Sequence, residues 1–197
     1  MKKIFAIAAA MVIAFATSAQ GFQMPPMPDN VVYFEYNFNL GQVEGRSYNH
    51  APTFFIYPDT KLDEAAAKAL VEEFDMRDVL KANHTTVFVI NPVGEKYDNT
   101  KDFEAFKPVF DRARSGNLKI IGIGNGATFV NTALAPTDAA GHIAGILTID
   151  GKPGKTPTQS WGVPAYVTGK NAAKVMWDYF KMFSRDPQTK KLIYHGK

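Results

Sequence analysis

Continuous apolar runs alternate along the chain with segments in which apolar residues recur every three or four positions. The runs are rich in β-branched and aromatic side chains, a composition that favours strands. The predicted strands cover residues 31–38, 53–57, 85–90, 118–123, 143–149, 163–168 and 192–194. The segments with helical spacing cover residues 62–80, 102–114, 128–135 and 171–183, and Pro108 is expected to kink or divide the second of them.

The alternation of these elements indicates an α/β protein. Strands that are apolar throughout are buried on both faces, and parallel strands need crossover connections, which helices supply. The pattern therefore predicts a mostly parallel sheet with helices on both faces, formed by one domain that covers residues 31–197.

The N-terminal segment has the features of an export signal. Lys2 and Lys3 precede the apolar stretch 4–16, which is followed by small and mildly polar residues up to Gly21. That stretch is about 13 residues long, against the roughly 20 needed to cross a bilayer, and no cysteine follows it to carry a lipid. We predict a signal peptide over residues 1–21, a proline-rich linker over 22–30 and a periplasmic or extracellular location. No later apolar segment is long enough to predict a membrane span.

Composition removes several classes of function. The chain has 197 residues, of which 46% are hydrophobic, and this is typical of a globular protein rather than a disordered one. The absence of cysteine excludes thiolate metal sites and thiol nucleophiles. A net charge of +3, which falls to about +1 without the two lysines of the signal, gives no reason to expect nucleic-acid binding. The four histidines are scattered, so neither a metal site nor a resident cofactor is expected.

Residues that follow the predicted strands are the candidates for a site, because ligands of parallel sheets bind at the carboxyl ends of the strands. These residues are 58–60, 91–94, 122–126, 150–151, 169–171 and His195. Among them, Gly122, Gly124 and Gly126 alternate with other residues between a strand and a helix. Small residues at this spacing are what a sharp strand-to-helix turn requires.

This turn, within Lys-Ile-Ile-Gly-Ile-Gly-Asn-Gly-Ala, resembles the nucleophile elbow of the α/β-hydrolase family, in particular of secreted esterases and polyester depolymerases. The resemblance covers residues from Val31 to the C-terminus. It implies a serine in the middle of G-x-S-x-G, where this chain has Gly124, or Asn125 if the register slips by one. Neither residue can act as the nucleophile.

The same resemblance implies the other members of a hydrolase site. It places Asp150 as the acid and His195 as the base, and it assigns an oxyanion or ligand-binding role to the four residues Asp59, Thr60, Asn125 and Gly126. The chain also ends where a hydrolase would supply its last helix, which predicts a shortened domain. The expected substrate is a small ester outside the inner membrane, and whether the protein is an enzyme stays open.

Two other functions fit the same residues. A hydrolase fold without its serine could act as a non-catalytic module that binds a small molecule or a glycan. Alternatively, the Gly122–Ala127 turn could bind the phosphates of a dinucleotide, with Asp150 receiving a ribose hydroxyl. A nucleophilic side chain within hydrogen-bond reach of a histidine would favour the enzyme. Ser160 precedes a strand rather than following one, which argues against it as that nucleophile.

Overall fold

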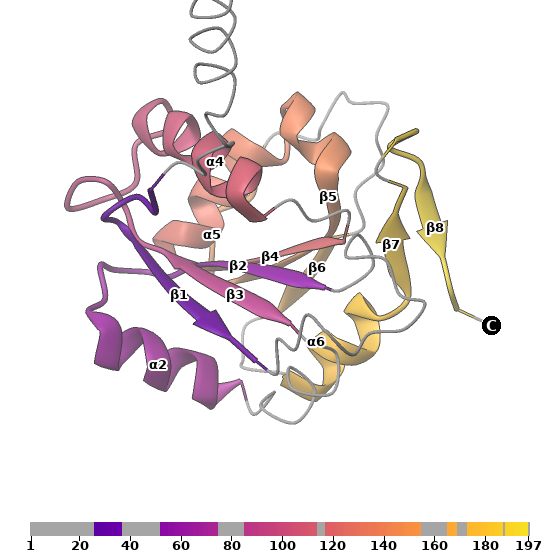
Figure 1. Ribbon diagram of the computed structural model, residues 1–197, viewed down its shortest axis with the longest axis horizontal. Helices are drawn as coiled ribbons and strands as arrows, with labels where there is room; N and C mark the ends of the chain where they lie inside the picture. Colours follow the sequence, from indigo (N-terminus) through magenta and orange to yellow (C-terminus); the bar gives the residue numbers. More distant parts are fainter. Residues whose placement is uncertain are drawn as a thin grey trace, which may run out of the picture.

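A computed structural model of the chain describes residues 26–36, 52–74, 85–113, 117–154, 165–168, 173–186 and 188–196. In these residues a six-stranded sheet carries helices on both faces, and a two-stranded sheet lies beside it (Figure 1). The predicted fold class, α/β with a mostly parallel sheet, is confirmed. The predicted signal peptide and residues 22–25 of the predicted linker lie outside the described residues. None of the described helices is long and apolar enough to cross a membrane.

The main sheet has the strand order β1-β3-β2-β4-β5-β6. Its strands are β1 (Val31–Glu35), β2 (Thr53–Tyr57), β3 (Thr86–Ile90), β4 (Leu118–Ile123), β5 (Ile143–Ile149) and β6 (Ala165–Thr168). Strand β1 is antiparallel to β3, and all other neighbours are parallel. After β2 the chain adds β3 on one side and β4 on the other. The boundary between β2 and β4 is therefore a topological switch point, where open α/β sheets bind ligands.

Alternate residues of the central strand β2 build the two halves of the core. The helices that cover the sheet are α2 (Glu64–Glu73), α4 (Lys101–Ala113), α5 (Asn125–Phe129) with the π-helical turn η2 (Val130–Leu134) that continues it, and α6 (Ala173–Phe180). Phe54 and Ile56 pack against α2 and α6, whereas Phe55 and Tyr57 pack against α4 and α5. The helices accordingly lie in two layers, one above and one below the sheet (Figure 1). A short 3₁₀ helix, η3 (Asp138–His142), leads into β5.

Polar side chains fix the helix starts and the loop after β3. Asp63 caps α2 by accepting a hydrogen bond of 2.8 Å from the backbone N–H of Ala66. The buried carboxylate of Asp102 accepts hydrogen bonds from the backbone N–H groups of Val93 and Asp98. Helix α4 runs unbroken through Pro108, so the expected division of this helix does not occur.

Several predicted boundaries differ from those in the structure. Strand β1 ends at residue 35 instead of 38, α2 ends at residue 73, and the helix after β4 begins at Asn125 instead of Thr128. The last helix ends at Phe180, and residues Phe183–Arg185 form the strand β7, which the sequence analysis missed. Strand β7 pairs in antiparallel fashion with β8 (Leu192–Tyr194), which was predicted. Three residues are too few to show a strand period, so the apolar Phe183 was attributed to the helix before it.

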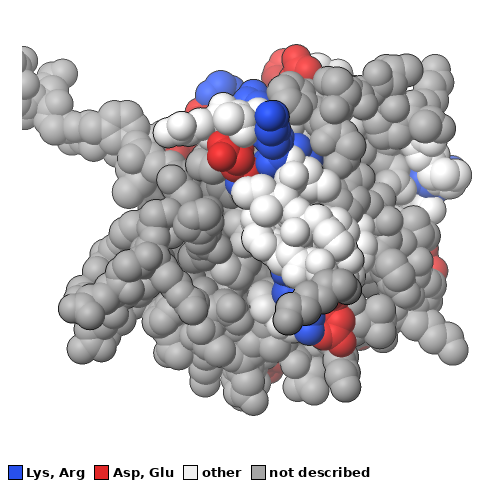
Figure 2. Space-filling model, turned by 90° about the vertical axis from the view of Figure 1, so that its right-hand side faces the viewer, with Lys and Arg blue, Asp and Glu red and all other residues white. Residues whose placement is uncertain are grey.

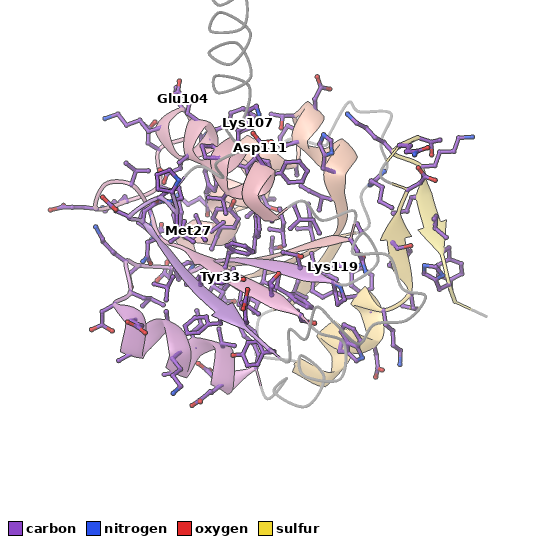
Figure 3. The ribbon with its side chains drawn as sticks, in the orientation of Figure 1. Met27, Tyr33, Glu104, Lys107, Asp111 and Lys119 are labelled. Atoms are coloured by element: carbon purple, nitrogen blue, oxygen red, sulfur yellow. The ribbon has the colours of Figure 1, made fainter. Side chains whose placement is uncertain are left out.

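Two buried basic side chains attach the β7–β8 pair to the main sheet. The Lys119 ammonium, on β4, donates a hydrogen bond to the backbone carbonyl of Phe183, and the Arg185 Nε donates to the carbonyl of Ile143 at 2.8 Å. Lys119 is 1% exposed, and it lies where the main sheet approaches the β7–β8 pair (Figure 3). Both contacts are made at the amino ends of β4 and β5. The β7–β8 pair therefore lies at the opposite end of these strands from the turn that follows β4.

The burial of Lys119 predicts a pH-dependent stability. Desolvation, with a smaller effect from the Arg185 guanidinium, lowers the pKa of Lys119 to about 7, whereas an unfolded lysine has a pKa of about 10.4. Between these values the unfolded chain binds more protons, so the free energy of unfolding rises with pH, by at most about 1.4 kcal/mol per pH unit. Urea unfolding at several pH values measures this rise.

The matched control for this experiment is a lysine that is exposed. Lys119→Met should remove most of the rise, whereas Lys61→Met, on the surface, should leave it in place. Equal slopes in the wild type and in Lys119→Met would show that the Lys119 amine keeps its charge in the folded protein.

Candidate functional site

The turn between β4 and α5 has the backbone of a sharp strand-to-helix elbow. Gly124 adopts φ 53° and ψ −114°, a conformation that side chains disfavour. A Cβ atom on Gly122 would lie 2.6 Å from the Cα of Ala127, and one on Gly126 would lie 2.1 Å from the carbonyl oxygen of Tyr57. Both distances are shorter than any ordinary contact. The alternating glycines therefore allow α5 to pack directly on β4 and on the end of β2.

The Asp59 carboxylate occupies the position that a side chain on residue 124 would need. Asp59 follows β2, and its Oδ1 accepts a hydrogen bond of 2.7 Å from the backbone N–H of Asn125. The Asn125 side-chain amide donates in return to the Asp59 carbonyl at 3.3 Å. A Cβ on Gly124 would lie 2.2 Å from Asp59 Oδ1 and 2.5 Å from its Cγ. A carboxylate thus occupies the space into which a side chain on residue 124 would project.

Asp150 lies on the other side of Gly124. The backbone N–H of Gly124 donates to the carbonyl of Ile149 at 2.8 Å, and Asp150 follows Ile149 with φ 55°. The structure therefore groups Asp59, Asn125 and Asp150 around the elbow, and all three are exposed. Among the described residues, no cluster of three histidines, aspartates or glutamates could hold a metal ion.

The remaining predicted ligand residues differ in their accessibility. Thr60 follows Asp59 and is exposed. Gly126 is buried beneath the carbonyl of Tyr57, so its surface is covered by β2. The set of exposed predicted residues at this edge is therefore Asp59, Thr60, Asn125 and Asp150.

His195 lies far from this edge. It follows β8, and its Nε2 lies 2.7 Å from the Oγ of Ser184 on β7. Arg185, the next residue of β7, binds the amino end of β5, whereas Asp150 follows its carboxyl end. Seven strand residues span on the order of 20 Å. The structure therefore pairs His195 with Ser184 and does not bring it near Asp150.

Ser184 was not among the predicted site residues, because it was assigned to no strand. In the sequence, Asp186-Pro187 stands between two short runs that contain apolar residues. That pattern is a signal for a hairpin and could have placed Ser184 opposite the C-terminal strand. No sequence signal by itself indicated the diagonal contact with His195.

Side chains from neighbouring strands hold the loop that carries Asp59. The Asn91 amide, at the end of β3, accepts from the N–H of Leu62 at 2.9 Å and donates to the Leu62 carbonyl at 2.8 Å. On the side of β5, the Thr128 hydroxyl donates to the carbonyl of Gly124 and accepts from the N–H of Lys152. The loops after β2 and β5 are thus tied to β3 and α5, respectively.

The aromatic groups beneath the elbow are not available as bases. Burial raises the pKa of both Tyr57 and Tyr97 well above the usual value, and the negative charge of Asp102 adds to the effect. Tyr97 donates its hydroxyl hydrogen to the carbonyl of Ile90 at 2.7 Å, while the buried hydroxyl of Tyr57 has no hydrogen-bond partner. Both phenols remain protonated and serve as part of the core.

No protein-family model and no curated protein matches the sequence. Among solved structures, the chain is similar to a carboxylesterase from the ammonia-oxidizing thaumarchaeon Nitrososphaera gargenis, with a TM-score of 0.43 and 16% identity over 68% of this chain and 47% of that one. It is also similar to an α/β hydrolase enzyme from a Medee basin deep-sea metagenome library, with a TM-score of 0.37 and 15% identity over 60% and 40% of the two chains.

A third similar structure is a lipase-esterase related protein from Clostridium acetobutylicum, with a TM-score of 0.36 and 10% identity over 62% of this chain and 47% of that one. The chain spans less than half the length of each of these three proteins.

The packing of α5 on β2 predicts that Gly126→Ala is destabilising. Its methyl group would lie 2.1 Å from the carbonyl of Tyr57, so the backbone must shift, at a cost of roughly 1–3 kcal/mol in the free energy of unfolding. In the control Gly94→Ala, the nearest atom lies 3.8 Å away, and the change should stay within about 0.5 kcal/mol. Urea unfolding compares the two. Equal effects would contradict the close approach of α5 to β2.

The overlap between Asp59 and a side chain on residue 124 predicts coupled substitutions. Gly124→Ala alone suffers from both the backbone conformation and the contact with Asp59, whereas Asp59→Ala removes the second of these penalties. In a double-mutant cycle measured by urea unfolding, the double variant should be more stable than additivity predicts, by about 0.5–3 kcal/mol. An additive cycle would mean that Asp59 can leave this position without cost.

Proposed function

We propose that the protein is an exported relative of esterase-type α/β hydrolases that binds a ligand at the elbow without hydrolysing it there. The observation that carries this proposal is the Asp59 carboxylate, which fills the space of a nucleophile at Gly124 and takes the N–H of Asn125. The predicted signal peptide over residues 1–21 supports export.

Among the described residues, the elbow lacks the nucleophile, the free oxyanion donor and the histidine of serine-type catalysis. Gly124 has no side chain, and the N–H of Asn125, which would stabilise an oxyanion, already binds a carboxylate. The two described histidines, His142 and His195, lie at the amino ends of the strands, because His142 directly precedes β5. No described histidine is therefore placed to activate a hydroxyl at this edge.

Dinucleotide binding is the weaker alternative. The glycine turn does lie at a topological switch point, as that function requires. A phosphate, however, would have to displace the Asp59 carboxylate from the N–H of Asn125, and the charges of Asp59 and Asp150 would repel it.

A neutral ligand rich in hydroxyl groups fits the edge best, and we propose a glycan. Carboxylate oxygens at Asp59 and Asp150 accept hydrogen bonds from hydroxyl groups, and Thr60 and the Asn125 amide add further polar contacts. The two carboxylates disfavour anionic ligands, including the free acids that ester hydrolysis releases.

Isothermal titration of the purified protein with cellopentaose and xylopentaose tests this function, with trigalacturonate as the anionic comparison. We expect binding of a neutral oligosaccharide and weaker binding of the anionic one. Asp59→Ala should weaken the neutral interaction by about tenfold or more, since a hydrogen bond to a charged group is worth roughly 1.5–3 kcal/mol.

The control variant is Asp111→Ala, which removes a carboxylate from the surface of α4 (Figure 3) and should leave the affinity unchanged. Two results would overturn the proposal. One is the absence of binding to both neutral oligosaccharides. The other is hydrolysis of nitrophenyl butyrate that Asp59→Ala abolishes, which would make this edge catalytic.

A further inference from the structure

We propose that Ser184 and His195 form a nucleophile and base pair that accepts the acyl group of small esters. Ser184 Oγ lies 2.7 Å from His195 Nε2, within the distance at which an imidazole removes the proton of a hydroxyl. In the β7–β8 ladder Ser184 pairs with Ile193, and His195 lies two positions further along β8. The two side chains are therefore diagonal neighbours on one face of the ladder.

The backbone on both sides of Ser184 is fixed to the main sheet. The carbonyl of Phe183, directly before it, accepts from the Lys119 ammonium, and the Arg185 guanidinium, directly after it, donates to the carbonyl of Ile143. The Arg185 guanidinium also donates to the carbonyl of Lys190 at 2.6 Å. These contacts hold a nucleophile in one position, which is the condition that a reactive hydroxyl requires.

His195 is fixed in a similar way. Its backbone N–H donates to the carbonyl of Met182 at 2.7 Å, which extends the pairing of the two strands beyond Tyr194. The His195 side chain is exposed, so a proton that it takes up can pass to a leaving group or to water.

The reaction that this pair can perform is acyl transfer in two steps. Ser184 Oγ attacks the ester carbonyl carbon while His195 Nε2 takes the hydroxyl proton; the bond to the alcohol oxygen breaks, and the imidazolium returns the proton to the departing alkoxide. Water then attacks the acyl-serine, its proton passes to His195, and the bond to Ser184 Oγ breaks as the oxygen regains a proton. The products are the free acid and the alcohol.

The surroundings limit the substrate to a short acyl chain. Ser184 is only 8% exposed, so a bulky acyl group cannot reach it. Its direct partner Ile193 is 39% exposed on the same face and offers an aliphatic contact. Seen from the side that carries β7 and β8, uncharged residues form a group with charged residues above and below it (Figure 2). A small, uncharged aliphatic ester is the class that fits.

This pair is independent of the proposed glycan edge, because it lies at the amino ends of β4 and β5. Exposing the purified protein to nitrophenyl acetate, quenching with acid and mapping the acetyl group by peptide mass spectrometry tests it. We expect acetyl on Ser184, together with release of nitrophenol. His195→Gln, which retains a hydrogen-bonding side chain but no base, should slow the acetylation of Ser184 by about 100-fold or more.

Further variants distinguish acetylation of Ser184 from acetylation of other residues. Ser184→Ala should abolish this acetylation, whereas Tyr194→Phe, which changes a neighbouring exposed residue, should retain it. Acetyl found only on lysines, or an unchanged rate in His195→Gln, would overturn the proposal. If Ser184→Ala fails to fold by circular dichroism, the position of the acetyl group in the wild type decides alone.

Discussion

The close packing of α5 against the ends of β2 and β4 is the constraint from which the elbow follows. Because the helix begins directly on the sheet, only glycine fits at residues 122 and 126, and the chain must turn at residue 124 with positive φ. The same approach brings the N–H of Asn125 to the end of β2, where Asp59 accepts it. The backbone of the turn is thus a sharp strand-to-helix elbow, and the polar group placed against it is a carboxylate from the loop after the neighbouring strand.

Different polar groups lie at the two ends of the parallel strands. At the carboxyl ends, acidic and amide groups surround a glycine, and neither of the two described histidines lies there. At the amino ends, two buried basic side chains hold a short antiparallel pair that carries a serine and a histidine. Burial, together with the nearby Arg185 guanidinium, explains the cost of keeping the Lys119 amine charged.

The sequence was sufficient to predict the parts of the fold that burial determines. Strands β2, β4 and β5 are apolar nearly throughout because both of their faces are covered, and their predicted bounds match the structure. The position of the elbow followed in the same way from Gly122, Gly124 and Gly126. The occupation of the elbow by Asp59 could not be predicted, since it depends on the side-by-side placement of β2 and β4. Ser184 was missed because its strand is too short to show a period.

The contact between Asp59 and the elbow also has a consequence for sequence change over time. A serine introduced at position 124 meets the Asp59 carboxylate at once, so that first step carries a steric penalty. If Asp59 is replaced first, the protein loses only the exposed hydrogen bond to the N–H of Asn125, and the space beside residue 124 becomes free. Replacing Asp59 before Gly124 therefore avoids the steric overlap, whereas replacing Gly124 first does not. The residue in the loop after β2 thus limits which side chains are tolerated at the turn after β4.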